Sequence, residues 1–115
     1  MLDEQAFFDV LSDETRRRIL SLIIKEEELC VCELFFALDM PQPKVSRHLA
    51  VMRDAGVLTM RKEGTWVFYR LQPQLPLWAL KVLEMMVQGV AGVSIYRQDG
   101  ERLANMSNRP VKCCM

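Results

Sequence analysis

The chain has 115 residues, of which 50% are hydrophobic and 26% are charged, and this composition excludes a disordered protein and favours a single globular domain. Fifteen Lys and Arg residues balance fifteen Asp and Glu residues, which excludes a uniformly basic protein that coats nucleic acid. The charges are placed unevenly, because residues 1–40 carry a net charge of −6 and residues 41–70 a net charge of +4. A positive block of this kind suits either a solvated face or a surface that contacts phosphates.

The N-terminus and the cysteines predict a cytoplasmic protein without a membrane partner. The chain begins Met-Leu-Asp-Glu, which is acidic where a signal peptide is basic, and its apolar runs are too short to cross a bilayer. In the cytoplasm thiols stay reduced. The cysteines form two close pairs, Cys30 with Cys32 and Cys113 with Cys114, and in a reducing compartment such pairs indicate thiolate chemistry rather than structural disulfides.

Helical periodicity predicts three helices in the first 40 residues. The first covers residues 3–11, and Ser12 is the expected N-cap of the second, which runs to about Lys25. The third begins around the first cysteine pair. Its apolar stripe follows the spacing i, i+3, i+4, i+7 and consists of Val31, Leu34, Phe35 and Leu38.

A fourth helix, from Gln42 to about Ala55, follows a tight break at residues 39–41 and ends at Gly56. It has a narrow apolar seam and an opposite side that is polar and basic. Two short helices with this break between them predict a helix-turn-helix whose second helix enters the major groove of DNA.

After Gly56 the hydrophobic period changes from 3.6 to 2, which predicts a β-hairpin of residues 57–62 and 65–71 with Glu63 and Gly64 at its turn. The fold class is therefore mainly α with a small β-hairpin, a winged helix-turn-helix. On electrostatic grounds we expect basic side chains of the fourth helix and of the hairpin, the wing, to contact DNA phosphates and bases. These residues are Lys44, Arg47, Arg61 and Lys62.

Pro73 and Pro76 open the last predicted helix, which runs to about Gln88 and is apolar on nearly every side from Leu75 to Val87. A chain of this length cannot bury all of these faces, so we expect a homodimer held by the first and last helices. Its expected contact residues are Phe7, Leu75, Trp78, Leu80, Val82, Leu83 and Met86. The dimer would read an inverted repeat with half-sites about 34 Å apart or a multiple of that. Residues 1–90 then form one DNA-binding and dimerisation domain, and residues 91–115 a flexible tail.

Residues 29–34 (Leu-Cys-Val-Cys-Glu-Leu) and 41–49 (Pro-Gln-Pro-Lys-Val-Ser-Arg-His-Leu) resemble the arsenical-responsive repressors of the ArsR/SmtB family. The resemblance covers about residues 5–88, including the wing. It implies a homodimer that occupies its operator DNA without ligand and dissociates when trivalent arsenic or antimony binds cysteine thiolates. It also implies base or backbone contacts for Gln42, Ser46 and His48, although His48 has an equal expectation of packing within the protein.

Two positions depart from the family pattern. Relatives with this Cys-x-Cys motif usually carry a third cysteine three residues after the second, and Phe35 stands there in this chain. Relatives commonly carry Ser where this chain has Pro41, so an N-cap hydroxyl and a possible phosphate contact are lost.

Trivalent arsenic is soft and prefers thiolates, which makes Cys30 and Cys32 the predicted ligands. On an ideal helix these side chains would point about 200° apart, so the start of the helix must be irregular for both to bind one ion. We expect the helix N-terminus to lower the pKa of both thiols. The competing interpretation is that both are small buried residues. Cys113 and Cys114 either supply the missing third ligand, from either subunit, or take no part, and the second alternative is favoured.

Other chemistries find little support in the sequence. His48 is the single histidine, and the last predicted helix holds neither His nor Asp, which argues against a zinc site. The sequence shows no phosphate-binding glycine loop, catalytic triad or organic cofactor motif, so we do not expect an enzyme. The alternatives are a repressor of the same fold that responds to thiol oxidation and, less favoured, a thiol redox enzyme, for which the Cys-x-x-Cys spacing is missing.

Overall fold

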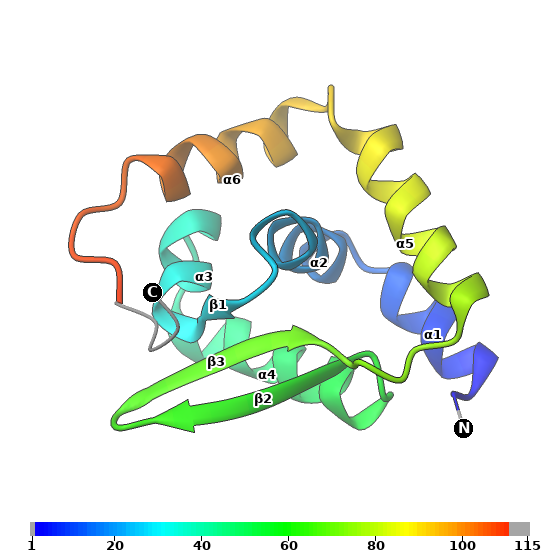
Figure 1. Ribbon diagram of the computed structural model, residues 1–115. Helices are drawn as coiled ribbons and strands as arrows, with labels where there is room; N and C mark the ends of the chain where they lie inside the picture. Colours follow the sequence, from blue (N-terminus) through cyan, green and yellow to red (C-terminus); the bar gives the residue numbers. More distant parts are fainter. Residues whose placement is uncertain (1, 111–115) are drawn as a thin grey trace.

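The computed structural model describes residues 2–110, and within them it contains six helices and three strands (Figure 1). In chain order these are α1 (Glu4–Leu11), α2 (Glu14–Glu26), β1 (Leu29–Cys30), α3 (Val31–Leu38), α4 (Gln42–Asp54), β2 (Leu58–Glu63), β3 (Trp66–Leu71), α5 (Leu77–Val90) and α6 (Ser94–Ala104). Helix α2 runs through the centre of the molecule and contacts α1, α3, α4, α5, α6, β1 and β3. The core is therefore built around the buried side of α2.

Acidic caps define the first two helices. The Asp3 side chain accepts a hydrogen bond from the backbone N–H of Gln5 at 3.3 Å, and Asp13 accepts one from the N–H of Arg16 at 3.0 Å. The predicted N-cap of α2, Ser12, is therefore wrong by one residue. Its hydroxyl instead donates to the carbonyl of Asp9 at 2.7 Å and closes α1.

The predicted helix-turn-helix is confirmed in α3 and α4. Helix α3 ends at Asp39, whose backbone is left-handed with φ of 55° and whose N–H donates back into the helix. Pro41 caps α4 without a side-chain hydrogen bond, as expected from the missing hydroxyl. The seam of α4 packs into the core through Val45, Leu49 and Met52. Gly56, with φ of 80°, turns the chain into the wing.

The hairpin is confirmed and belongs to a larger sheet. Strands β2 and β3 are antiparallel and pair Glu63 with Trp66, so the turn residues are Gly64 and Thr65, one position later than predicted. Strand β1 adds to the other side of β3, giving the order β1-β3-β2. Its two residues are too few to show a period of 2 in the sequence. This short strand fixes Cys30 opposite Phe68 and so ties the cysteine pair to the wing.

The prediction of a flexible tail is wrong for residues 94–104, which form helix α6. This helix packs along α3 (Figure 1). Tyr96, Asp99 and Leu103 are buried there. Asp99 forms an ion pair with Arg18 of α2, with atoms 2.7 Å apart. The sequence pattern misses this helix because its buried stripe has a charged residue, Asp99, between the apolar residues Tyr96 and Leu103.

Within residues 2–110 no single helix is long and apolar enough to span a bilayer. Only α5 and α6 together have the required length and composition, and they meet at a bend of 94°.

Candidate functional site: a dithiol at the start of α3

The sulfur atoms of Cys30 and Cys32 lie 3.2 Å apart. Cys30 is the last residue of β1 and the N-cap of α3, with an extended backbone at φ of −75° and ψ of 151°. Because Cys30 is not helical, the wide angle that an ideal helix would impose on the pair does not apply. Both cysteines are free thiols. The irregular helix start that the sequence requires for a two-sulfur site is therefore present.

Burial decides the ionisation of Cys32. Cys30 is 2% exposed and Cys32 is half-buried. Burial, followed by the hydrogen bond that Cys32 donates to the Cys30 sulfur, raises the pKa of Cys32 to about 12. The prediction that the helix N-terminus lowers this pKa is wrong for Cys32, because loss of solvation outweighs the favourable backbone contact from Glu33. At neutral pH Cys32 is a thiol.

Glu33 anchors the dithiol to a distant part of the chain. Its carboxylate accepts a hydrogen bond from the backbone N–H of Cys30 at 2.8 Å through Oε1 and one from Arg109 Nε at 2.6 Å through Oε2. Arg109 also lies 3.2 Å from the carboxylate of Glu26. Sequence analysis missed the contact between Glu33 and the backbone N–H of Cys30, although a Glu three residues after an N-cap residue is the signal of a capping box.

The structure does not complete a three-ligand site within the residues it describes. Phe35, at the position of the usual third cysteine, is half-buried. Over residues 2–110 no three His, Cys, Asp or Glu side chains lie together in a way that could hold a metal ion. The remaining sequence candidates, Cys113 and Cys114, lie outside the described residues.

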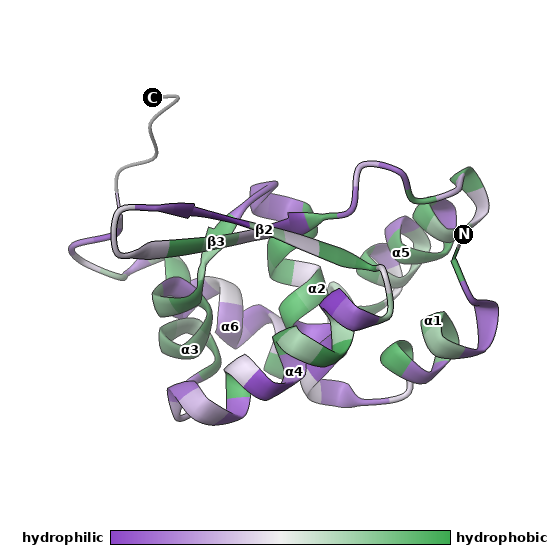
Figure 2. Ribbon diagram, turned by 90° about the horizontal axis from the view of Figure 1, so that it is seen from below, coloured by the Kyte–Doolittle hydropathy of each residue, from purple (hydrophilic) through white to green (hydrophobic). Residues whose placement is uncertain are grey.

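The predicted DNA-contact residues gather on one edge of the molecule. Figure 1 shows α4 and the β2–β3 hairpin along the lower edge, and Figure 2 views this edge from below, where α4 presents hydrophilic segments. The side chains of Gln42, Lys44, Arg47 and Lys62 are exposed, and Ser46 is half-buried.

Two of the predicted DNA-contact side chains are engaged within the protein. Arg61 donates two hydrogen bonds to Glu28, at 2.8 and 2.9 Å, and lies over the ring of Phe68 at 4.5 Å from its centroid. Its charge is thus compensated by a neighbour that precedes β1. His48 Nδ1 lies 3.4 Å from Arg16 Nη1, against the start of α2, and burial lowers the pKa of this imidazole.

The predicted dimer residues divide between the core and the surface. Phe7 and Leu83 are fully buried within the protomer, so assigning them to an exposed interface is wrong. Trp78 is 44% exposed, and it packs against both Phe7 and Phe8 of α1 with ring centroids 5.2 and 6.0 Å apart. The most exposed apolar side chains of α1 and α5 are Phe8, Leu77, Trp78 and Met85. The predicted residues Leu75, Leu80, Val82 and Met86 are half-buried.

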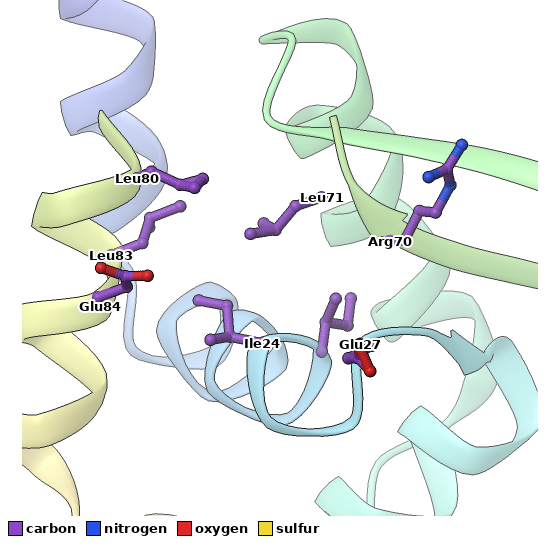
Figure 3. A pocket seen from close by; sticks show the side chains of 8 residues that line it. Ile24, Glu27, Arg70, Leu71, Leu80, Leu83 and Glu84 are labelled. Carbon is purple, nitrogen blue, oxygen red and sulfur yellow. The ribbon is translucent and has the colours of Figure 1, made fainter. Parts of the chain in front are cut away.

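A pocket of about 420 Å³ lies between α2, β3 and α5 (Figure 3). Helices α2 and α5 and strand β3 each contribute apolar side chains to its wall, and three charged residues border it. The lining residues are Ile23, Ile24, Glu27, Arg70, Leu71, Leu80, Leu83 and Glu84. The pocket is separate from the dithiol, since the two sites share no residue.

Comparison with known proteins places these features in context. Residues 13–59 match the family described as "Bacterial regulatory protein, arsR family". The chain is 49% identical over 105 residues to the arsenic resistance transcriptional regulator ArsR1 of Pseudomonas putida, covering 90% of this chain and 79% of that protein. It is 46% identical over 117 residues to ArsR2 of the same organism, covering 99% and 100%. The crystal structure of the AntR antimony-specific transcriptional repressor has a TM-score of 0.63 at 27% identity, covering 76% of this chain and 77% of that one.

Proposed function

The chain belongs to the arsR family of bacterial regulatory proteins, and from this membership we propose that it is an arsenical-responsive repressor. It binds operator DNA as a homodimer and leaves the DNA when trivalent arsenic or antimony binds Cys30 and Cys32. The observation that carries this proposal is the 3.2 Å separation of the two sulfurs at the start of α3. The names of the P. putida relatives support arsenic, and that of the AntR repressor supports antimony.

The raised pKa of Cys32 suits arsenous acid as the inducer. Divalent metal ions bind thiolates and must displace protons, which a buried thiol releases reluctantly. Arsenous acid is a neutral hydroxide that condenses with thiols. Each condensation forms one As–S bond and breaks one As–O bond, the hydroxide leaves with the thiol proton as water, and arsenic stays trivalent. Two thiols therefore bind one arsenic atom without net release of protons.

Burial of Cys30 supplies the link between binding and conformation. An arsenic atom bound to a sulfur that is 2% exposed must displace neighbouring atoms, because protein interiors are closely packed. The displaced segment is the first turn of α3. At its other end α3 continues through Asp39 and Met40 into α4, and the Met40 N–H donates to the Phe35 carbonyl at 3.1 Å. A shift of α3 therefore moves the DNA-reading helix.

The free energy needed to release the protein from DNA is modest compared with that of covalent ligation. Moving a population from almost wholly bound to almost wholly free takes a differential affinity of about 5.5 kcal/mol. Two As–S bonds in each subunit are made only if α3 adopts the ligand-bound arrangement. We therefore assign the inducer's differential affinity to these bonds.

For DNA we propose that Gln42, Ser46 and Arg47 contact bases and the nearby backbone, while Lys44 and Lys62 contact phosphates. Their exposure on the edge shared by α4 and the wing supports this assignment. We leave Arg61 out of the phosphate contacts because Glu28 already holds its guanidinium. His48 serves to pack α4 against α2.

The homodimer we propose is formed by α1 and α5, through the exposed side chains Phe8, Leu77, Trp78 and Met85. The DNA-reading helix of each subunit then contacts one half of an inverted repeat in the operator. Such a protein works in the cytoplasm with its DNA, has no catalytic role and needs no organic cofactor.

An electrophoretic mobility shift of the DNA upstream of the chain's own gene tests this function. Under strictly reducing conditions the protein should retard the fragment, and sodium arsenite should release it. A parallel reaction with hydrogen peroxide and no arsenite tests the alternative, a repressor that responds to oxidation of the two neighbouring sulfurs. Release by peroxide but not by arsenite would contradict the arsenical function and support the redox one.

A further inference from the structure

We infer that the wing is a second output of the dithiol, and that arsenic bound at Cys30 draws the β2–β3 hairpin away from DNA through Phe68 and the contact between Glu28 and Arg61. These three residues, Glu28, Arg61 and Phe68, are called the wing link. The inference rests on the proposed function, because it concerns how the same ion releases the same DNA. It adds a second connection to the one through α3 and α4, and it gives Arg61 a role as a positioning residue.

The sheet places Cys30 in line with the wing. Strand β1 pairs with β3 so that Cys30 lies opposite Phe68, and β3 pairs with β2 so that Phe68 lies opposite Arg61. Residues that lie opposite each other on neighbouring strands point to the same face of a sheet. For Arg61 and Phe68 the contact is direct, since the guanidinium carbon lies 4.5 Å from the centroid of the ring. One row across the sheet therefore connects the dithiol with β2.

The side chain of Arg61 reaches back to the segment that precedes β1. Its Nε and Nη2 donate hydrogen bonds to the two carboxylate oxygens of Glu28, at 2.9 and 2.8 Å. A pair with two parallel hydrogen bonds fixes the relative direction of the two groups as well as their distance. Glu28 lies two residues before Cys30 in the sequence, and its side chain is 15% exposed. Strand β2 is thus attached to the dithiol segment by side chains as well as through β3.

Close packing around Cys30 converts arsenic binding into a movement of β1. Cys30 is 2% exposed, and Phe68 opposite it is 0% exposed. An arsenic atom on the Cys30 sulfur needs volume that neighbouring atoms occupy, because protein interiors are closely packed. Cys30 is both the last residue of β1 and the N-cap of α3, so the displaced segment includes β1. When β1 moves, Glu28 moves with it and draws Arg61 along.

The movement of Arg61 reaches a residue that we propose contacts DNA. Lys62 follows Arg61 in β2, and its side chain is exposed. A displacement of Arg61 moves the backbone of the hairpin and takes Lys62 away from its phosphate. One bound ion therefore removes two kinds of DNA contact, those of α4 through α3 and that of the wing through the wing link.

The affinity for DNA that remains in the presence of arsenite tests the wing link. Arg61→Met keeps an apolar side chain over Phe68 and removes both donors to Glu28. Fluorescence anisotropy of labelled operator should show native affinity without arsenite. With saturating sodium arsenite under reducing conditions, the variant should bind roughly tenfold more tightly than the native chain, because its wing stays in place. Glu28→Gln weakens the same contact from its other end and should act in the same direction. Native affinity of both variants with arsenite would overturn the inference.

Glu63→Gln is the matched control for the charge next to Arg61. Glu63 Oε1 lies 3.6 Å from Arg61 Nη1, but Glu63 belongs to the hairpin itself and has no connection to β1 through this contact. Arsenite should therefore release Glu63→Gln as it releases the native chain. If Glu63→Gln retains DNA as strongly as Arg61→Met does, the effect comes from the charge of the wing, and the wing link is wrong.

A Lys62→Ala background tests that the connection ends at the wing. In this background the DNA contact that the wing link controls is already absent. Adding Arg61→Met should therefore leave the affinity with saturating arsenite unchanged. An equal gain in affinity in the native and Lys62→Ala backgrounds would show that Arg61 acts on another part of the DNA interface, and would contradict the inference.

Trp66 reports on the wing in the absence of DNA. It is the first residue of β3, next to the turn of the hairpin, and it is 40% exposed. The chain has two tryptophans, so Trp78→Phe leaves Trp66 as the single fluorescent reporter. Arsenite should change the Trp66 emission of this chain, and Arg61→Met should abolish the change although arsenite still binds. No change with the wing link intact, or the same change without it, would overturn the inference.

Failure of this inference is distinguishable from failure of the proposed function. If only the inference is wrong, arsenite releases the native chain, release requires Cys30, and the Glu28 and Arg61 variants leave the operator to the same extent. If the function is wrong, arsenite leaves the native chain on the operator or releases Cys30→Ser equally well, and the inference falls with it.

Discussion

Arg18 of α2 and Asp99 of α6 form a buried ion pair in which Nε and Nη2 each donate a hydrogen bond to the carboxylate, at 2.8 and 2.7 Å. Arg18 Nη2 also lies 3.3 Å from the carbonyl of Leu38, and Arg102 Nε donates to the carbonyl of Ala37 at 2.6 Å. The C-terminal end of α3 is therefore held by both α2 and α6. Because Glu33 makes further contacts at the start of α3, this helix is fixed at both ends, and it lies next to α4, the helix that we propose reads DNA.

Removing the acid of this pair should destabilise the fold strongly. Asp99→Ala leaves Arg18 charged and buried without its partner, and we expect a loss of about 3–5 kcal/mol in the free energy of unfolding. Urea denaturation measures it. Glu101→Ala, at an exposed position of the same helix, is the control and should change stability by less than about 0.5 kcal/mol. A loss for Asp99→Ala as small as that of the control would show that the pair does not hold α6.

Two basic residues of the wing, Arg61 and Lys62, should behave differently towards salt. Lys62 is exposed and contacts a phosphate in the proposed complex, so Lys62→Ala should reduce the slope of log K against log salt by about one, without altering sequence preference. Arg61→Ala is the matched comparison, since Glu28 compensates its charge, and it should leave the slope nearly unchanged. Titration of labelled operator at several salt concentrations gives both slopes. The reverse order of the two effects would contradict the assignment of the wing contact to Lys62.

The dimer interface is tested at its most exposed apolar residue. Leu77 is 73% exposed in the protomer, so Leu77→Asp should preserve the fold and convert the dimer into a monomer, because a charge would be buried in the interface. Sedimentation equilibrium at micromolar concentration measures the mass. Phe36→Asp, at an exposed residue of α3 away from α1 and α5, should remain dimeric. If Leu77→Asp is still a dimer, α5 is not the interface.

The raised pKa of Cys32 gives the protein a defined pH dependence. Below the ordinary pKa of a cysteine the folded and unfolded chains both hold the proton, so stability is unaffected. Between that value and about 12 the unfolded chain loses the proton while the folded chain keeps it, and stability falls as pH rises. Alkylation by iodoacetamide reports the thiolate directly. At pH 9 we expect Cys32 to react much more slowly in the folded chain than in urea, and equal rates would contradict the raised pKa.

The parts that sequence predicted best are those fixed by local periodicity. The stripe of α3, the seam of α4 and the alternation in β2 and β3 are visible because each residue's face follows from its neighbours in the chain. Strand β1 could not be predicted from periodicity, because two residues cannot show a period. The position of Cys30 at the junction of β1 and α3 depends on its pairing with Phe68 of β3.

The parts that sequence missed depend on charges that meet across long separations. Asp99 finds Arg18 and Arg109 finds Glu33 only after the chain has folded, so helix α6 and the segment after it look like a polar tail. The pKa of Cys32 was predicted in the wrong direction for a related reason. Burial of the Cys32 thiol in the folded chain outweighs the local effect of the helix terminus.

The central claim is that Cys30 and Cys32 turn arsenite binding into release from DNA. The most direct measurement is the fluorescence anisotropy of labelled operator, titrated with sodium arsenite under reducing conditions, for the native chain, Cys30→Ser and Cys32→Ser. All three should bind the operator equally well, and only the native chain should lose its anisotropy as arsenite is added. Release of Cys30→Ser and Cys32→Ser at the same arsenite concentration as the native chain would contradict the account.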